Sequence, residues 1–560
     1  MFIPETRDEL DALGWKTLDV ILVTGDAYVD SPFIGVAVIG KVLLDAGYRV
    51  GIIAQPDVAS DRDIRSLGEP ELFWGITSGC MDSMVANYTA TRKKRRRDDL
   101  TAGGVNDRRP NLAVIAYTNL VRRHFKNTRP IVLGGLEASL RRVSHYHQAT
   151  DTIRRSILFD AKADILVYGM GERTVLELAE RIRGGRSVSD VRGICYAASQ
   201  KKEGFLELPS HAMAAADPEA FTRMFKTFYE NNDPVTAQGL CQHQDSRYLI
   251  HNPPQPPLST EELDHVHELD YERDVHPRDA RQGPVRALET IRFSLTTHRG
   301  CYGGCLFCSI SVHQGQAVVN RSEESLLREA GALTAHPRFK GIIQDVGGPT
   351  ANMYGIDCGR RKEKGSCRHR RCLTPGVCKG LKVSHGRQIA LLRKLRALPR
   401  VKKVFIGSGI RHDLVLRDGS HGLEYLEEII RHHISGQLKL APEHSENEIL
   451  DLMGKPPIES FLEFKRHFDE INGRLGKRQY LTCYFIAAYP GCTLRHMERL
   501  NRFARSILKF RPRQVQIFTP SPSTPATLMY HAKKSYRTAT PLFVEKQDRG
   551  KERQKGVLSQ

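Results

Sequence analysis

Tryptophan occurs only twice in the 560 residues, aromatic residues make up 7% of them, and no apolar segment is long enough to cross a membrane. The longest apolar run, FIGVAVIGKVLLDAG, contains Lys41 and is shorter than the roughly 20 residues that a membrane helix needs. The first ten residues, MFIPETRDEL, lack the basic and apolar regions of a secretory signal. These absences predict a soluble cytoplasmic protein with no membrane partner.

Acidic residues are also fewer than basic residues. The chain has 64 Asp and Glu residues against 84 Lys and Arg residues, which gives a net charge of +20. Such an excess favours a nucleic-acid partner. The basic run RKKRRR at residues 92–97 has no aromatic residues between its charges on which bases could stack, so a solvated surface loop is the alternative interpretation.

Apolar runs that alternate with helical patterns organise the first part of the chain. These runs are rich in Val, Ile and Leu and show no polar alternation, which is typical of a parallel sheet covered on both faces. The predicted strands are DVILVTG, YRVGIIAQP, LAVIAYT, PIVLGG and ADILVYG, and the predicted helices are PFIGVAVIGKVLLDAG and ERTVLELAERIRGG. We therefore expect an α/β open-sheet domain over residues 1–215, followed by a proline-rich linker over residues 216–285.

The same alternation resumes in the second half of the chain. Six strand-and-helix units follow one another, from TIRFSLTTHRGC to RQVQIFTPSPSTP. Regular βα units predict a partial (βα)6 barrel of the TIM type over residues 286–535, and in such barrels the loops after the strands carry the chemistry. The last segment, residues 536–560, is polar and basic, and we expect it to be disordered.

Three of the twelve cysteines lie within eight residues, in HRGCYGGCLFC after the first predicted barrel strand. Cys301, Cys305 and Cys308 have the spacing C-x3-C-x2-C, and the glycines around them let the backbone wrap closely around a bulky group. Three thiolates can hold three irons of a [4Fe–4S] cluster and leave the fourth iron open, since such a cluster normally takes four cysteines. The alternatives are a redox pair formed by the last two cysteines, and a zinc site completed by His298 or His313.

The chain resembles the radical S-adenosylmethionine (SAM) enzymes, which carry C-x3-C-x-aromatic-C after the first strand of a βα barrel. Within that superfamily it resembles the YgiQ-like proteins, through the strings RFSLTTHRGCYGGCLFCSISVHQG, GGPTANMYG, LKLAPEHS and YFIAAYPGCT. The resemblance implies one [4Fe–4S] cluster, bound SAM, and reductive cleavage of SAM to a 5′-deoxyadenosyl radical. It also implies a one-electron donor such as flavodoxin or ferredoxin, but it does not supply the substrate.

The resemblance further implies roles for single residues. Cys301, Cys305 and Cys308 would be the cluster ligands, and Phe307 would lie against the adenine of SAM. The other residues with an implied role in SAM binding follow later barrel strands, and the two after the third strand would contact the ribose or the carboxylate. These residues are Gly347, Gly348, Ser408, Arg411, Lys439 and Glu443.

Two pairs among these residues need a further remark. Gly347 and Gly348 would bind the SAM amino group through backbone oxygens, but Pro349 stands where the superfamily often has a glutamate. Lys439 and Glu443 would either bind SAM or pair with each other.

A second group of cysteines lies in CGRRKEKGSCRHRRCLTPGVC, in the loop after the second barrel strand. The arginines and lysines around it favour thiolates. Four cysteines fit a zinc ion or a second iron–sulfur cluster, and their spacing does not select between these metals, while bare reduced thiols are the third alternative. The four residues are Cys358, Cys367, Cys372 and Cys378.

The first domain resembles the cobalamin-binding domain of some radical SAM methyltransferases, in the strings IVLGGLEAS and ADILVYGMGERT. Cobalamin itself is not expected, because the motif Asp-x-His-x-x-Gly is absent and the first histidine of the chain is His124. The string GMGERT lacks the third glycine of a dinucleotide fingerprint. We therefore expect this domain to cover the barrel mouth or to select the substrate.

Two other functions stay open. One is RNA modification, by methylthiolation or methylation, within the same superfamily. The other is a non-catalytic iron–sulfur or zinc protein that binds nucleic acid. Formation of 5′-deoxyadenosine from SAM would separate an enzyme from a binding protein, and salt-sensitive RNA binding would favour a nucleic-acid partner.

Overall fold

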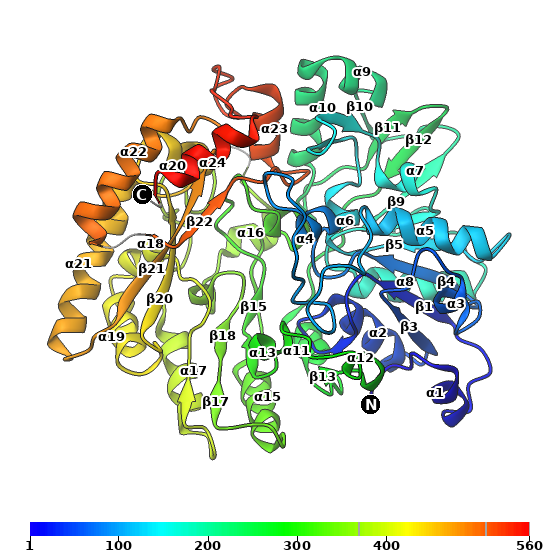
Figure 1. Ribbon diagram of the computed structural model, residues 1–560, viewed down its shortest axis with the longest axis horizontal. Helices are drawn as coiled ribbons and strands as arrows, with labels where there is room; N and C mark the ends of the chain where they lie inside the picture. Colours follow the sequence, from blue (N-terminus) through cyan, green and yellow to red (C-terminus); the bar gives the residue numbers. More distant parts are fainter. Residues whose placement is uncertain (368–369, 510–511, 559–560) are drawn as a thin grey trace. The chain divides into compact units, whose positions relative to one another are not determined.

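The computed structural model describes residues 1–367, 370–509 and 512–558. The chain divides into two units, shown in Figure 1, each with its own helices and strands. The first unit comprises Met1–Leu258 and His265–Arg292, and the second comprises Ser259–Asp264 and Phe293–Gln560.

Nine strands of the first unit form one sheet. They are β1 (Val20–Thr24), β3 (Val50–Ala54), β4 (Phe73–Thr77), β5 (Ile131–Leu133), β8 (Ile165–Val167), β9 (Ile194–Ala198), β10 (Leu206–Leu208), β11 (Leu240–Gln244) and β12 (Arg247–His251). Their order in the sheet is β10-β11-β12-β9-β8-β5-β4-β1-β3. Five neighbouring strands of the sheet, β8, β5, β4, β1 and β3, are parallel, as expected. The strands β9, β12 and β11 extend the sheet by antiparallel pairing.

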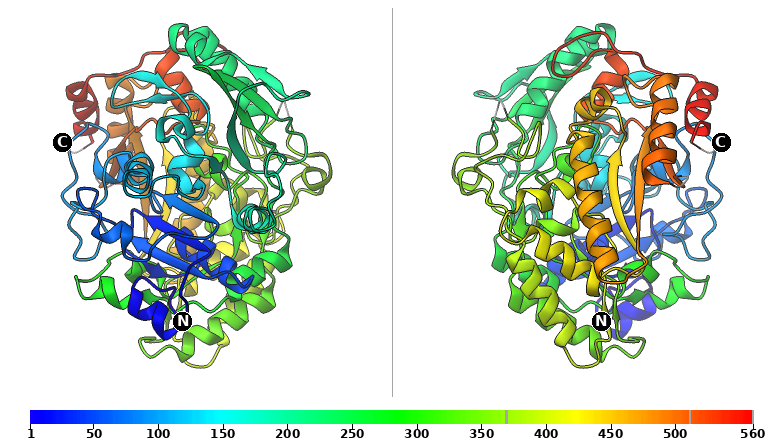
Figure 2. Two further views of the ribbon diagram at one scale, coloured as in Figure 1. Left: turned by 90° about the vertical axis from the view of Figure 1, so that its right-hand side faces the viewer. Right: turned by 90° about the vertical axis from the view of Figure 1, so that its left-hand side faces the viewer.

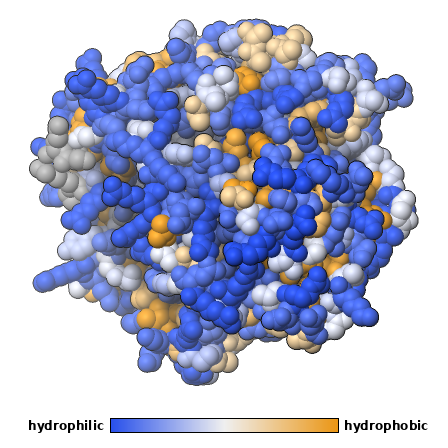
Figure 3. Space-filling view, turned by 45° about the vertical axis from the view of Figure 1, so that its right-hand side comes forward, coloured by the Kyte–Doolittle hydropathy of each residue, from blue (hydrophilic) through white to orange (hydrophobic). Residues whose placement is uncertain are grey.

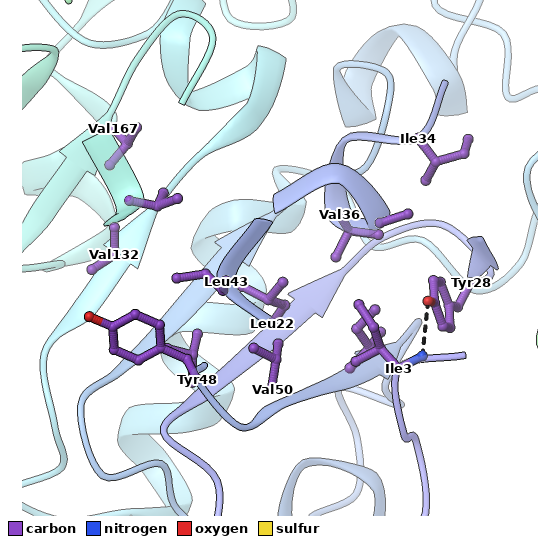
Figure 4. Close-up of a cluster of buried hydrophobic side chains, with 14 of the residues drawn as sticks. Ile3, Leu22, Tyr28, Ile34, Val36, Leu43, Tyr48, Val50, Val132 and Val167 are labelled. Atoms are coloured by element: carbon purple, nitrogen blue, oxygen red, sulfur yellow. Dashed lines mark hydrogen bonds between the residues drawn. The ribbon is translucent and has the colours of Figure 1, made fainter. Parts of the chain in front are cut away.

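Helices cover this sheet because its central strands are apolar on both faces. Every residue of β1 is buried. On one face α2 (Gly35–Asp45) and α8 (Glu172–Arg183) contribute Leu43 and Leu178 to a core that also contains Leu22 of β1. Figure 4 shows Leu22 and Leu43 together in this core. The predicted strands at DVILVTG, YRVGIIAQP, PIVLGG and ADILVYG and both predicted helices are confirmed.

One predicted strand is wrong. The string LAVIAYT lies mostly in α5 (Ala113–His124), where buried Val114, Tyr117 and Val121 recur at helical spacing. A short apolar run cannot be assigned by periodicity alone, and the polar face of this helix emerges only in the residues that follow the run. A strand that pairs with β1, β4 in FWGIT, was not predicted.

The predicted linker over residues 216–285 is also wrong, because most of it is ordered within the first unit. It contains α10 (Pro218–Glu230) together with β11 and β12. Asp217 caps α10 by accepting hydrogen bonds from the backbone N–H groups of Glu219 and Ala220, and Pro218 suits the first helical turn. The prolines of HNPPQPPL interrupt regular structure only after β12.

Six parallel strand positions in the second unit confirm the expected partial barrel, with the second position split between β17 and β18. The strands are β14 (Ser294–Thr296), β17 (Ile342–Ile343), β18 (Asp345–Gly347), β19 (Lys403–Val404), β20 (Gln437–Glu443), β21 (Tyr480–Ala487) and β22 (Gln514–Ile517). Parallel pairing joins β14 to β18, β17 to β19, β20 to β21 and β21 to β22, and a parallel bridge links Ile410 with Leu440.

A helix follows each of the first five strand positions of this barrel. These helices are α15 (Glu323–Ala335), α17 (Gly386–Ala397), α19 (Gly422–His432), α21 (Ile458–Arg474) and α22 (Leu494–Phe503). Figures 1 and 2 show α19, α21 and α22 along one side of β20, β21 and β22. Along β20 the buried Leu438 and Leu440 alternate with the exposed Lys439, so the other face of this part of the barrel is open.

The end of the chain differs from the expected disordered tail. The segment contains α24 (Asp548–Gly556), in which Lys551 and Gln554 are buried. The Gln554 side chain accepts a hydrogen bond from Ala488 N–H at 2.9 Å and donates to Cys492 O at 3.1 Å. A polar sequence is ordered here because its side chains bind backbone groups at the end of β21; residues 559–560 lie outside the described residues.

The face of the molecule that Figure 3 shows is largely hydrophilic. Figure 3 shows one face on which hydrophobic residues occur only in small separate groups. Among the described residues, no helix has both the length and the apolar character needed to cross a bilayer. All six residues of the basic run, 92–97, are exposed.

Candidate active site

The first cysteine loop begins after β15 (His298–Arg299), at the carboxyl end of the first barrel strand. Cys301, Cys305 and Cys308 are partly buried in it. Gly303 lies against two of the sulfurs, since a Cβ atom there would be 3.2 Å from Cys301 Sγ and 3.7 Å from Cys305 Sγ. The Gly303 N–H also donates to Cys301 Sγ at 3.3 Å. The glycine therefore lets the loop bend with its sulfurs close to the backbone.

The three thiols influence one another. Burial, together with the nearby Cys305, raises the pKa of Cys301 and raises that of Cys308 to about 12. In the described part of the chain no three His, Cys, Asp or Glu side chains surround a position for a metal ion. A [4Fe–4S] cluster takes each cysteine on a separate iron, so the donor atoms and spacing of this loop fit such a cluster.

Arg411 carries a buried positive charge to this loop. Its Nη1 donates to Cys305 Sγ at 3.7 Å, and its Nε and Nη2 donate to the Asp413 carboxylate at 2.8 and 2.6 Å. Burial alone would lower the pKa of Arg411, but the Asp413 carboxylate outweighs burial and raises it. Burial likewise would raise the pKa of Asp413, and the guanidinium lowers it instead. Both groups are therefore charged at neutral pH.

A chain of polar side chains fixes the backbone of Arg411. The Asn352 side chain accepts from Arg411 N–H at 2.7 Å and donates to Arg411 O at 3.0 Å. Its amide also lies 3.2 Å from His385 Nε2, while His385 Nδ1 lies 2.8 Å from the Asp418 carboxylate. This arrangement requires that Nδ1 carries the histidine proton and Nε2 accepts. Asn352 belongs to the string GGPTANMYG, but its link to Arg411 could not be predicted from the sequence.

Aromatic rings form a wall next to the cysteine loop. The ring of Phe307 meets the edge of Tyr489 at a centroid distance of 6.3 Å, and Tyr489 in turn lies 5.0 Å from Phe518. Tyr489 is fully buried, and its hydroxyl donates to Leu452 O at 2.9 Å. Sequence analysis singled out Phe307 but missed Tyr489, which lies two residues after the end of β21 within YFIAAYPGCT.

Lys439 and Glu443 do not pair with each other. Lys439 is exposed, whereas Glu443 is buried and lies 3.9 Å from Lys455. The regular alternation of β20 ends at a β-bulge between Leu440 and Glu443, and Glu443 itself has a φ of 71°. Burial raises the pKa of Glu443 more than Lys455 and Arg411 lower it.

The glycine pair and Ser408 lie at neighbouring strand ends. Gly348 must be a glycine, because a Cβ atom there would be 2.7 Å from the His298 ring. The Gly347 carbonyl accepts from Thr297 N–H at 2.7 Å. The Ser408 hydroxyl donates to the carboxylate of Asp345, and the Ser408 N–H donates to the same group at 3.0 Å. The roles of these residues in SAM binding stay predictions.

The second cysteine group lies between β18 and α17, in the same unit. Three of its members, Cys358, Cys372 and Cys378, are partly buried against an apolar cluster, and Cys367 is exposed. The segment between Cys367 and Cys372 includes residues 368–369, which lie outside the described residues.

Comparison with known families gives a consistent result. Residues 2–294 match the family model described as radical SAM N-terminal. A UPF0313 protein of Fusobacterium nucleatum is 50% identical over 560 residues, which cover 100% of this chain and 99% of that protein. A UPF0313 protein of Thermotoga petrophila is 49% identical over 549 residues, covering 98% of this chain and 96% of that protein.

The fold is similar to that of a solved radical SAM methyltransferase, TsrM from Kitasatospora setae. The structure of TsrM with cobalamin and a [4Fe–4S] cluster bound matches with a TM-score of 0.51 and 13% sequence identity, over 90% of this chain and 72% of TsrM. A second TsrM structure, with tryptophan substrate and a SAM analogue, matches with a TM-score of 0.50 and 14% identity. At this identity the likeness concerns the fold alone.

Proposed function

Since the chain belongs to the UPF0313 family of radical SAM enzymes, we propose that it holds a [4Fe–4S] cluster through Cys301, Cys305 and Cys308 and cleaves SAM reductively. The observation that carries this proposal is the cysteine loop, in which Gly303 lies against the sulfurs of Cys301 and Cys305 and the buried charge of Arg411 lies beside them. The chemistry that the bound group supplies is one-electron cleavage of the S–C5′ bond, which gives methionine and a 5′-deoxyadenosyl radical.

The residues of the chain position the reactants and set the local charge. Arg411 compensates the negative charge of the thiolates, and the Gly303 N–H donates to one of them. Phe307 and Tyr489 offer an aromatic wall on which adenine can pack. The Glu443–Lys455 pair supplies a buried carboxylate and a buried ammonium near Arg411, suited to the charged ends of the methionine moiety.

The open face of the barrel is the proposed place for the substrate. On β20 and β21 the residues opposite the apolar helix-facing side are only partly buried or exposed. Lys439 and Thr482 are paired neighbours on this face, and Tyr484 and Ile486 continue it toward the aromatic wall. A face that mixes one ammonium, hydroxyls and apolar groups suits a substrate with both polar and apolar parts.

The test uses protein purified without oxygen and supplied with SAM and dithionite. The wild-type chain should form 5′-deoxyadenosine, and Cys305→Ala should form none and should lose the part of the broad brown absorbance that this cluster contributes. Cys483→Ala, which removes a buried thiol from β21 away from the loop, is the matched control and should keep both. A wild-type protein that carries the cluster but forms no 5′-deoxyadenosine would refute the proposed reaction.

The exposed basic run supports a second proposal, that the substrate is carried by a nucleic acid. Six consecutive Lys and Arg side chains at residues 92–97 face solvent, and the whole chain has a net charge of +20. Binding of total RNA should weaken steeply with salt, and replacing four of the six residues by serine should reduce the slope. RNA binding that is weak at low salt, or that is unchanged in the variant, would count against a nucleic-acid partner.

A further inference from the structure

The second cysteine group occupies a single loop next to the first. With the three cluster cysteines it brings seven of the twelve cysteines of the chain into residues 301–378. Arg371, inside the second loop, donates a hydrogen bond to the carbonyl of Gly304, which directly precedes Cys305. The two cysteine loops are therefore in direct contact within the second unit.

Tyr302 lies where the two loops meet. It directly follows Cys301 and is buried in an apolar cluster with Met353, Ile356, Leu373 and Leu381. The thiols packed against the same cluster come from both loops, and they are Cys301, Cys358, Cys372 and Cys378. Three of these thiols belong to the second loop, so this loop packs on the same apolar cluster as Tyr302.

Most thiols of the second loop lie on one apolar cluster. Cys358 and Cys372 both pack against the cluster that contains Tyr302. Cys378 joins them through its backbone, because its N–H donates to Cys372 O at 2.7 Å. Three thiols of a 21-residue segment thus pack on the apolar cluster around Tyr302, and the exposed Cys367 belongs to the same segment.

Two guanidinium groups face these sulfurs. Arg360 Nη1 lies 2.7 Å from Cys367 Sγ, and Arg361 Nη1 lies 3.5 Å from Cys372 Sγ. Arg361 is 8% exposed, and its buried Nε–H has no hydrogen-bond acceptor among the residues that the structure describes. A buried cation with an unused donor next to thiols suits a negatively charged sulfur-rich group, whose sulfides accept hydrogen bonds.

We propose that this loop holds a second iron–sulfur cluster of the [4Fe–4S] type, through Cys358, Cys367, Cys372 and Cys378. Because all four irons then have a protein thiolate, this cluster serves electron transfer. It takes one electron from a one-electron protein donor at the exposed Cys367 side and gives one electron to the first cluster past Tyr302, with no bond made or broken. This transfer role rests on the proposed function, whereas the metal content does not.

A zinc ion is the competing occupant. Structural zinc sites usually draw their cysteines from two closely spaced pairs, whereas this loop has the spacing C-x8-C-x4-C-x5-C. The position of this loop beside the first cysteine loop favours a redox group.

The test compares iron, sulfide and zinc in full-length protein prepared without oxygen. Wild type should hold about eight irons and about eight sulfides per chain, two clusters of four. Cys305→Ala with Cys308→Ala should keep about four, held by the second loop, and Cys372→Ala with Cys378→Ala should also keep about four. Cys80→Ala, in the first unit, is the control and should keep about eight. An unfolded variant would hold no cluster, whereas each double variant is expected to retain one, so loss of folding would give a different iron count.

Measurements of 5′-deoxyadenosine formation distinguish a failure of the second cluster from a failure of the proposed reaction. With dithionite, Cys372→Ala with Cys378→Ala should still form 5′-deoxyadenosine, while with reduced flavodoxin as donor its rate should fall about tenfold or more. About four irons in wild type, with or without about one zinc, would overturn the second cluster. About eight irons without any 5′-deoxyadenosine would leave the second cluster in place and refute the reaction instead.

Discussion

At the scale of single residues, Arg411 decides the electrostatics of the candidate site. Its guanidinium is buried, is held by Asp413 on one side, and reaches Cys305 Sγ on the other. A fixed positive charge next to a cluster stabilises the reduced, more negative state. The contact joins residues that are 106 positions apart in the chain, so no local pattern in the sequence indicates it.

Replacing Arg411 by glutamine should make the first cluster harder to reduce. We expect its reduction potential to fall by about 60 mV, a tenfold change in the one-electron equilibrium, because the charge is lost and Asp413 stays ionised. Arg411→Lys should recover most of the shift, and the exposed Arg417→Gln should change nothing. Redox titration followed by EPR measures the potential, and an unchanged value in Arg411→Gln would contradict this role.

A buried pair in the first unit makes its stability depend on pH. His276 Nδ1 lies 2.8 Å from the Glu5 carboxylate, and both side chains are almost fully buried. Burial raises the pKa of Glu5 to about 7; burial alone would lower the pKa of His276, but Glu5 outweighs it and raises it above its usual 6.5. Both groups hold protons more tightly in the folded state, so their contribution is present at low pH and is lost as pH rises through the raised values.

The midpoint of urea unfolding of the first unit should therefore fall between about pH 5 and about pH 8. Both tryptophans of the chain, Trp15 and Trp74, lie in this unit, so tryptophan fluorescence reports its unfolding selectively. Glu5→Gln should flatten the profile over this range. A wild-type midpoint that rises with pH over this range would show that other groups dominate.

At the scale of elements, long strands and helices were predictable and interrupted ones were not. β20 and β21 carry enough apolar residues to be recognised, and α8 shows a clear amphipathic period. The short run LAVIAYT fits either state, so its assignment to a helix depends on the residues that follow it. The bulge in β20 changes which face Glu443 occupies, and only the structure shows it.

The C-terminal helix α24 should stabilise the end of β21. Gln554→Ala would leave the buried N–H of Ala488 and the carbonyl of Cys492 without their partner, which costs about 1–3 kcal/mol. The exposed Arg549→Ala on the same helix is the control. Amide exchange of the β21 peptide, measured by mass spectrometry, should become faster in Gln554→Ala alone, and equal rates in the two variants would show that α24 does not secure this strand end.

At the scale of the whole molecule, the chain contains a mixed sheet and a partial barrel, and a segment of the chain covers the carboxyl edge of the sheet. Ligands of open α/β sheets bind at that edge. Here Asp26, which follows β1, forms a buried ion pair with Arg109, and Arg109 also lies 2.8 Å from Asp98. The segment 78–112 thus covers the edge with its own side chains.

We accordingly expect no stable binding of cobalamin. After incubation with hydroxocobalamin and gel filtration, the protein should retain no corrinoid absorbance, while TsrM treated alike serves as the positive control. Retention of about one corrinoid per chain would show that the segment 78–112 opens, and it would bring the chemistry of the two proteins closer together.

The central claim is that three thiolates hold a cluster with one iron left for SAM. The EPR spectrum of the dithionite-reduced Cys372→Ala, Cys378→Ala protein, which isolates the first cluster, tests it most directly when recorded with and without SAM. The account predicts a clear shift of the g-values on addition of SAM, because the open iron would take SAM as a ligand. Identical spectra at saturating SAM would contradict it.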